Sequence, residues 1–501
     1  MAYGSRKKVP KLQGYHFYKR ELCLYFGVYF AYLIYGLWIL FDLRKVLQQR
    51  SGFTRDPFNY ELDIFNNYVR SNWHWYIVHA IIATGSKFFF NRDNIGLAFA
   101  CVSIPSLLST LQFRMNIFLG TMLLIFYLVS YIGNRKLIWF ATALWVAVLN
   151  ILALNIGNFS DEQDIFYTFS VILFWTLLRC CSFAHFWADI KKVDLLKLST
   201  VTHYLGYTLY FPTLVNGPFL DYKRYIVILK KKDAYTFFNE VKYFAYEIVR
   251  IFFWWLVLEL GMRYLFVHYM AVETDKAKLV RSPFGRHAIG YFLGLSFFMT
   301  YFVKYGLGIA SSRYDGMHPP SKPQCIGHVH YYSNMWKHFD QGLYEFLFDY
   351  IYQPLVNANY SKFVSTVLTF AFVFMWHGCQ TEILIWTVMN FWCLIFEKLL
   401  KHAMRSTFYK SCIEQNLGKQ LSQRFHAIIF SQLFIVAAFA NVFFIGSPEM
   451  GVFLILNAYR NGFANYLALS FCCYCFFQCS ELISMKLWKE NVKWKRKAKS
   501  N

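Results

Sequence analysis

One histidine lies at the end of a long apolar run, where an ionisable side chain is costly. His377 follows the run Phe363–Trp376 and precedes Gly378 and Cys379 in the stretch FAFVFMWHGCQTEILIW. A helix over that run covers roughly 21 Å, which is short of the roughly 30 Å of a bilayer core. Either a helix continues through His377 or the chain breaks there, and both place the imidazole near hydrocarbon. Such a group is a candidate functional residue; the alternative is a neutral histidine hydrogen-bonded to a neighbouring helix.

An acidic residue upstream is the second candidate for chemistry. The segment WKHFDQGLYEFLFDYIYQ, residues 336–353, spaces polar and apolar residues three and four apart, which predicts one helix with two opposite faces. Its polar face, which carries Asp340, suits either the headgroup surface or a water-accessible cavity inside the membrane. The chain between Asp340 and His377 is long enough for a helix and a return, so the two side chains can meet across a helical hairpin.

A carboxylate beside an imidazole is suited to proton transfer. The acid fixes the tautomer of the imidazole and stabilises the imidazolium, and histidine titrates near neutral pH. Two chemistries use such a pair inside a membrane. One is acyl transfer with the histidine as general base, and the other is a proton relay in a transporter. The spacing of the two residues does not separate them.

The composition indicates which elements must position these residues. Hydrophobic residues make up 57% of the 501 residues, aromatic residues 21% and charged residues only 16%, which is typical of a membrane protein rather than of several soluble domains. Apolar runs recur along nearly the whole chain, and one crossing needs roughly 20 residues. We therefore expect an all-α polytopic protein with about ten to twelve membrane helices, some of them re-entrant pieces enclosed by other protein.

No repeat or long linker divides the chain. We expect one membrane domain over residues 21–485, with its catalytic core in about residues 200–450, between basic cytosolic segments at residues 1–20 and 486–501. The 51 basic against 28 acidic residues favour contact with anionic lipids over nucleic acid, because the basic residues lie between apolar runs. The cysteines lie mostly inside those runs and have no metal-binding spacing, so we expect neither a disulfide framework nor a metal site.

The C-terminus predicts a compartment. The last residues, KAKSN, place Lys497 and Lys499 as in a dilysine retrieval signal of the endoplasmic reticulum. A lysine-rich tail also produces this pattern by chance. We expect a multi-pass protein of the endoplasmic reticulum membrane, with the Golgi membrane as a further location.

An ordered set of motifs resembles a known family. An aromatic residue followed by an acidic one, and then an apolar run that ends in WHG, resembles the membrane-bound O-acyltransferase superfamily. The fuller set resembles its Hedgehog-type branch, the protein-cysteine N-palmitoyltransferases, and covers most of the chain from residue 200 onward. The motifs are YFPTLVNGP, YGLGIASSRYDGMHPPSKPQCIG, MWKHFDQGLYEFLF, LTFAFVFMWHGC and FANVFFIG.

The resemblance implies roles for individual residues. His377 corresponds to the catalytic histidine of the superfamily, and Asp340 to its partner. By the same correspondence Trp336 walls a tunnel for the acyl chain, while His338 and Asn441 line the pocket. A separate implication concerns a cofactor, because Cys325 matches a position at which relatives hold a haem through the thiolate.

The resemblance also implies substrates. The donor is palmitoyl-CoA, and the acceptor is the N-terminal cysteine of secreted signalling proteins such as Hedgehog, with EGF-like ligands as further acceptors. We consider Arg179, which lies in an apolar run, and the loop residues Lys223 and Arg224 candidates for contacts with the CoA phosphates; charges that set topology are the alternative. Two other functions stay open: a lipid O-acyltransferase of the same superfamily and a proton-coupled transporter.

Overall fold

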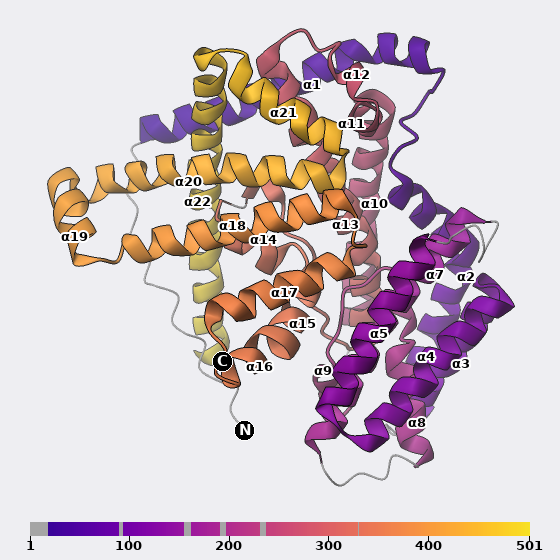
Figure 1. Ribbon diagram of the computed structural model, residues 1–501. Helices are drawn as coiled ribbons and strands as arrows, with labels where there is room; N and C mark the ends of the chain where they lie inside the picture. Colours follow the sequence, from indigo (N-terminus) through magenta and orange to yellow (C-terminus); the bar gives the residue numbers. More distant parts are fainter. Residues whose placement is uncertain are drawn as a thin grey trace.

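The computed structural model describes residues 19–89, 94–154, 162–190, 197–230, 237–328 and 330–500. Within these ranges every regular element is a helix (Figure 1), so the expected all-α fold is confirmed. Most of the predicted N-terminal basic segment lies outside the described residues, and so do the side chains of Lys497 and Lys499. The predicted domain boundaries stay a prediction.

The N-terminal part consists of one long separate helix and a group of helices that pack on one another. Figure 1 shows α1 apart from the group that α2 to α8 form on the other side of the molecule. In this group α3 packs against α2 and α8, while α4 and α5 pack against α7. The helices are α1 (Lys19–Ser51), α2 (Tyr60–Phe89), α3 (Ile95–Thr110), α4 (Phe113–Ile132), α5 (Arg135–Leu154), α7 (Gln163–Asp189) and α8 (Leu198–Thr208).

A long central helix, α13, organises the rest of the chain. It packs against α10, α20 and α21 and also against α1 and α2 of the N-terminal part. Short helices follow it, and two long hairpin helices, α18 and α20, lie side by side (Figure 1). The elements are η2 (Phe211–Thr213), α9 (Tyr222–Lys230), α10 (Phe237–Tyr264), α11 (Val267–Val272), α12 (Thr274–Ala277), α13 (Pro283–Tyr314), η3 (Ile326–His328), α14 (Tyr332–His338), α15 (Gln341–Phe346), η4 (Leu347–Tyr352), α16 (Gln353–Asn357), α17 (Lys362–Trp376), α18 (Thr381–Ala403), α19 (Thr407–Tyr409), η5 (Lys410–Glu414), α20 (Gln415–Ile445), α21 (Pro448–Arg460) and α22 (Phe463–Ser500).

Among the described residues, 8 helices are long and apolar enough to cross a membrane. They are α1, α4, α5, α7, α13, α18, α20 and α22. Two further apolar helices, α3 and α17, are shorter than a full crossing, and with them the set reaches the lower end of the expected range. The protein is a multi-pass membrane protein, and re-entrant placement of its short helices stays a prediction.

The predicted single helix over residues 336–353 is wrong. α14 ends at His338, and a new helix begins at Gln341 and continues through the π-helix η4 into α16. Asp340 is the N-cap between them, because its Oδ1 accepts a hydrogen bond from the backbone nitrogen of Leu343 at 2.9 Å. Aspartate is among the preferred N-cap residues. Periodicity alone did not reveal this break, because a capping aspartate has the spacing of a polar-face residue.

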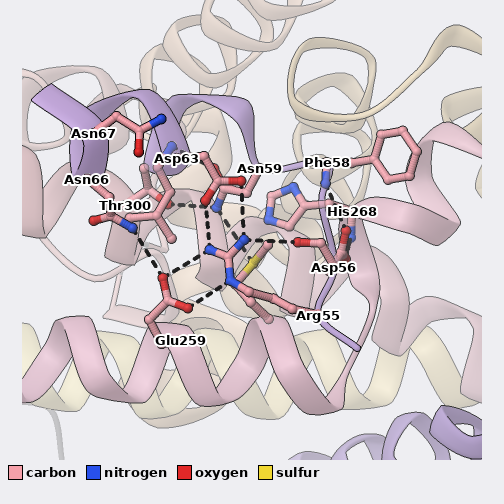
Figure 2. A network of polar contacts seen from close by, with 12 residues as sticks. Arg55, Asp56, Phe58, Asn59, Asp63, Asn66, Asn67, Glu259, His268 and Thr300 are labelled. Atoms are coloured by element: carbon pink, nitrogen blue, oxygen red, sulfur yellow. Dashed lines mark hydrogen bonds and ion pairs between the residues drawn. The ribbon is translucent and has the colours of Figure 1, made fainter. Parts of the chain in front are cut away.

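A polar network fixes the connection between α1 and α2 (Figure 2). Arg55 donates to the two carboxylate oxygens of Glu259 on α10 at 2.8 and 2.9 Å. Its Nη1 donates to Oδ2 of Asp63 on α2 at 3.2 Å and to the carbonyl oxygen of Asp56 at 3.4 Å. A guanidinium that binds a carboxylate through two parallel hydrogen bonds holds a defined orientation, so this pair ties the start of α2 to α10.

Asp56 completes this network from the same connection. Its Oδ2 accepts hydrogen bonds from the backbone nitrogens of His268 and Tyr269 at 2.9 and 3.0 Å (Figure 2). Burial raises the pKa of the Asp56 carboxyl to about 6, which still leaves it ionised at neutral pH, the form that accepts these bonds. The network therefore sets the position of the first turn of α2, which carries Glu61.

Candidate active site

His377 lies at the point where a membrane helix stops. α17 ends at Trp376, and the backbone nitrogen of His377 still donates to the carbonyl oxygen of Val373 at 3.1 Å. The chain then leaves the helix, because Gly378 has φ 118° and Cys379 has φ 56°. Left-handed φ favours glycine, so the glycine after the histidine permits this turn. The predicted alternative of a break at His377 is the one that the structure contains.

Two aromatic rings hold the imidazole of His377 in place. The ring of Trp386 on α18 lies 5.2 Å from it, and the ring of Phe444 on α20 lies 5.1 Å from it, both edge to face. Trp386 and Phe444 stack on each other at 4.5 Å. Aromatic packing of this kind restricts the rotamers of the histidine, so three helices together fix its direction.

Asp340 is held by α13 and by its own helix. The hydroxyl of Tyr305 donates to Oδ2 of Asp340 at 2.6 Å, while Oδ1 caps α15. No hydrogen bond joins Asp340 to His377, although both residues are described. The predicted direct contact, in which Asp340 orients the imidazole, is therefore not present in this structure.

His377 and Asp340 nevertheless face the same cavity. It has a volume of about 560 Å³, within the usual range for ligand pockets, about 300–1,000 Å³. Most of its lining is apolar and aromatic, and three charged residues line it: Glu61, Lys304 and Asp340. The cavity brings the two sequence-predicted residues together across open space, which leaves room for a substrate between them.

Two further predicted residues lie at this cavity, and one does not. Trp336 lines it, with its ring 5.5 Å from both Phe370 and Trp386. Asn441 also lines it and accepts a hydrogen bond from Nε1 of Trp386 at 3.1 Å, so it fixes one of the rings that hold the imidazole. His338 is half-buried at the end of α14 and is not among the lining residues.

Glu61 and Lys304 are cavity residues that the sequence did not indicate. Nζ of Lys304 lies 3.1 Å from Oε2 of Glu61, and the hydroxyl of Tyr301 lies 3.3 Å from Oε1. The field of Glu61 also reaches the imidazole of His377. In the sequence Glu61 looks like an ordinary acidic residue in the first turn of a helix. Its place in the cavity wall depends on how the helices pack, which the sequence does not show.

Arg179, a predicted CoA contact, has a structural role in this fold. Its buried guanidinium donates to the carbonyl oxygens of Thr208, Tyr210 and Thr213 and to the hydroxyl of Thr213. These hydrogen bonds engage the N–H donors of Arg179 and hold the segment between α8 and η2 against α7. Arg179 does not line the cavity, and a role for it in binding CoA phosphates stays a prediction.

We predict that Arg179→Met lowers the yield of folded protein without changing substrate affinity. The substitution leaves several carbonyl oxygens without donors, each at a cost of about 1–3 kcal/mol. The check is thermal unfolding in detergent, together with the KM for acyl-CoA of the fraction that folds. A normal melting curve with a raised KM would restore Arg179 as a donor contact.

The other two basic candidates lie on α9, away from the cavity lining. Nζ of Lys223 is 3.7 Å from Asp189, and Nη1 of Arg224 is 2.9 Å from Glu345. Lys223 is exposed and Arg224 is half-buried. A role for them in binding CoA phosphates stays a prediction.

Cys325, the predicted haem ligand, is half-buried in the loop before η3 and forms no disulfide. The next two residues, Ile326 and Gly327, line the cavity, whereas Cys325 does not. The structure therefore does not place the sulfur of Cys325 on the wall of this cavity. Haem at Cys325 stays a prediction that no step below uses.

Apolar membrane helices that enclose a cavity, with a histidine and an aspartate facing it, define a class of protein: polytopic membrane enzymes whose site lies among their helices. The chain belongs to the membrane-bound O-acyltransferase family, whose model matches residues 121–440. It is therefore an acyltransferase.

Three named proteins indicate which branch of this family the chain resembles. The chain is 38% identical to the protein-cysteine N-palmitoyltransferase Rasp of Drosophila melanogaster over 93% of this chain and 95% of that protein. It is 26% identical to the protein-cysteine N-palmitoyltransferase HHAT of Mus musculus over 49% of this chain and 50% of that protein. An HHAT-like protein of Mus musculus is 24% identical over 70% of each chain.

Proposed function

We propose that the protein transfers palmitate from palmitoyl-CoA to the N-terminal cysteine of secreted signalling proteins of the Hedgehog type. The near full-length similarity to a protein-cysteine N-palmitoyltransferase supports this acceptor class. The observation that carries the proposal is that His377 and Asp340 line one largely apolar cavity. EGF-like ligands are a further acceptor class in this proposal.

The cavity suits a long acyl chain. Burial of a C16 chain contributes roughly 12 kcal/mol at about 0.8 kcal/mol per methylene, before ordering costs. Trp336 and the ring pair Trp386 and Phe444 form part of the wall nearest to His377. A chain held there presents its thioester carbon beside the imidazole, which is the positioning that acyl transfer requires.

His377 is the general base in this proposal. The acceptor is an α-amino group with a pKa of about 8, and its neutral form attacks the thioester carbon. As the N–C bond forms, the imidazole takes a proton from nitrogen; as the C–S bond breaks, that proton passes to the CoA thiolate. The products are an amide and CoA with a free thiol. Initial attack by the cysteine thiol, followed by an S-to-N shift, gives the same products.

Asp340 supports this chemistry from its place in the wall of the same cavity. Its carboxylate, fixed by Tyr305 and by the N-terminus of α15, favours the imidazolium through space as His377 gains its proton. Polar donors near the thioester, including the side-chain amide of Asn441, stabilise the developing oxyanion. In this arrangement the cytosol supplies palmitoyl-CoA, and the lumen of the endoplasmic reticulum supplies the acceptor.

The experiment is an assay of purified protein in detergent with labelled palmitoyl-CoA and a peptide that begins with cysteine. The proposal predicts an amide-linked palmitoyl peptide that survives hydroxylamine, which cleaves thioesters. Label in added lipid instead of peptide supports a lipid O-acyltransferase. No product in either acceptor, with proton-coupled uptake into proteoliposomes, supports a transporter.

A further inference from the structure

A second acidic residue, Glu61 in the N-terminal part of the chain, shares the cavity with Asp340. Glu61 lies in the first turn of α2, and the network around Arg55 and Asp56 fixes that turn (Figure 2). Glu61 lines the cavity, and about a third of its side chain, 34%, is exposed there. A carboxylate that borders open space can accept further hydrogen bonds from a ligand.

α13 holds both carboxylates on one stripe of its surface. Tyr301 contacts Glu61, and Tyr305, one turn further along, donates to Asp340. The rings of these tyrosines are 5.4 Å apart, and one turn of helix rises about 5.4 Å. Glu61 and Asp340 are therefore neighbours along one edge of the cavity.

The two carboxylates differ in how many hydrogen bonds they can still accept from a ligand. Each oxygen of Asp340 accepts a hydrogen bond from the protein, one from Tyr305 and one from the nitrogen of Leu343. Glu61 accepts from Tyr301, interacts with the hydroxyl of Tyr167 and pairs with Lys304, whose side chain is only 9% exposed. With four lone-pair sites on its two oxygens, the partly exposed Glu61 retains capacity toward the cavity.

The acceptor brings one charge to this site. Its α-amino group is largely an ammonium at neutral pH, and burial of an unpaired charge is costly. We propose that Glu61 binds the N-terminal ammonium of the acceptor protein and positions that nitrogen beside His377: the ammonium loses its first proton to water, and the imidazole takes the second as the neutral amine attacks. This inference rests on the proposed function, because it concerns the acceptor of the same reaction.

Lys304 offsets part of the negative charge that Glu61 presents to the acceptor. A carboxylate alone would stabilise the ammonium and so oppose its deprotonation. Nζ of Lys304 sits against Glu61 and over the ring of Tyr301 at 4.9 Å, where it offsets part of the negative charge. Glu61 thus attracts the ammonium, and the ammonium can still lose its first proton to water before the neutral amine attacks.

The test compares two competitor peptides that differ only in the amino group. One peptide begins with alanine, and the other carries a propionyl group in its place, which is alanine without its nitrogen. Both compete with the cysteine peptide in the palmitoyl transfer assay. In the unmodified protein the alanine peptide should inhibit at about tenfold lower concentration or less, since a close charge pair contributes at least about 1.5 kcal/mol.

Glu61→Gln keeps the shape of the side chain and removes its charge. In this variant the two inhibition constants should agree within about twofold, while the KM for palmitoyl-CoA stays unchanged. The double variant Glu61→Gln, Lys304→Gln guards against misfolding, because it removes both members of the pair and leaves no unpaired ammonium; it should behave likewise. Glu449→Gln, on the exposed first turn of α21, is the matched control and should keep the tenfold preference.

The outcomes separate the inference from the proposed function. If the unmodified protein makes no amide product on the cysteine peptide, the proposed function fails. If it does, and both Glu61 variants keep the preference for the alanine peptide, the inference is overturned and the function stands. Loss of the preference in Asp340→Asn but not in the Glu61 variants also overturns it, since Asp340 would then bind the ammonium.

Discussion

Replacement of His377 by alanine is expected to lower palmitoyl transfer by about 10² to 10⁴-fold, the contribution typical of a general base. The imidazole is the nearest base to the predicted thioester position, held between Trp386 and Phe444. Folding should survive, because the side chain borders a cavity and makes no side-chain hydrogen bond to another described residue that its loss would leave unpaired. The measurement is the initial rate of amide formation with labelled palmitoyl-CoA, at equal amounts of monodisperse protein.

His402→Ala is the matched control for this variant. His402 is exposed near the end of α18, and its loss should leave the rate within about twofold, as for most surface substitutions. An unchanged rate in His377→Ala would remove the histidine from the chemistry. A loss of rate in both variants would point to damage to the protein rather than to a missing base.

The second large effect is expected for Asp340→Asn, a loss of kcat on the order of 10²-fold. Asparagine caps a helix about as well as aspartate, so α15 should keep its start. What disappears is the negative charge on the cavity edge that favours the imidazolium in the transition state. Steady-state kinetics should therefore show a lower kcat with little change in the KM for palmitoyl-CoA.

Tyr305→Phe separates the charge of Asp340 from its orientation. This variant removes the hydroxyl that donates to Oδ2 and keeps the aspartate side chain. We expect a smaller loss, less than about tenfold, because one hydrogen bond contributes roughly 1 kcal/mol. Equal losses in the two variants would mean that orientation, not charge, is what Asp340 provides.

The sequence predicted the parts of this account that depend on local chemistry. The mismatch between an apolar run and an imidazole at its end singled out His377, because a buried ionisable group is costly wherever the chain folds. Composition and hydropathy predicted an all-helical membrane protein, because each crossing of the bilayer needs a long apolar run. Motif resemblance predicted the family, which the match over residues 121–440 confirms.

The features that the sequence did not predict depend on tertiary placement. Arg179 in an apolar run suggested a phosphate contact. In the structure its guanidinium instead donates hydrogen bonds to three backbone carbonyl oxygens. Asp340 had the spacing of a helix face but caps a new helix. Glu61 carried no local signal, because α13 and the network around Arg55 decide that it faces the cavity. Glu61 and His377 are far apart in the sequence, so the sequence gives no sign that both line one cavity.

The most direct test of the shared cavity is a structure of the protein with a palmitoyl-CoA analogue that cannot transfer its acyl group. We predict that the acyl chain occupies the cavity beside Trp336, with its first carbon between His377 and Asp340. Density for the chain on another surface, with no passage from its first carbon to His377, would contradict the account.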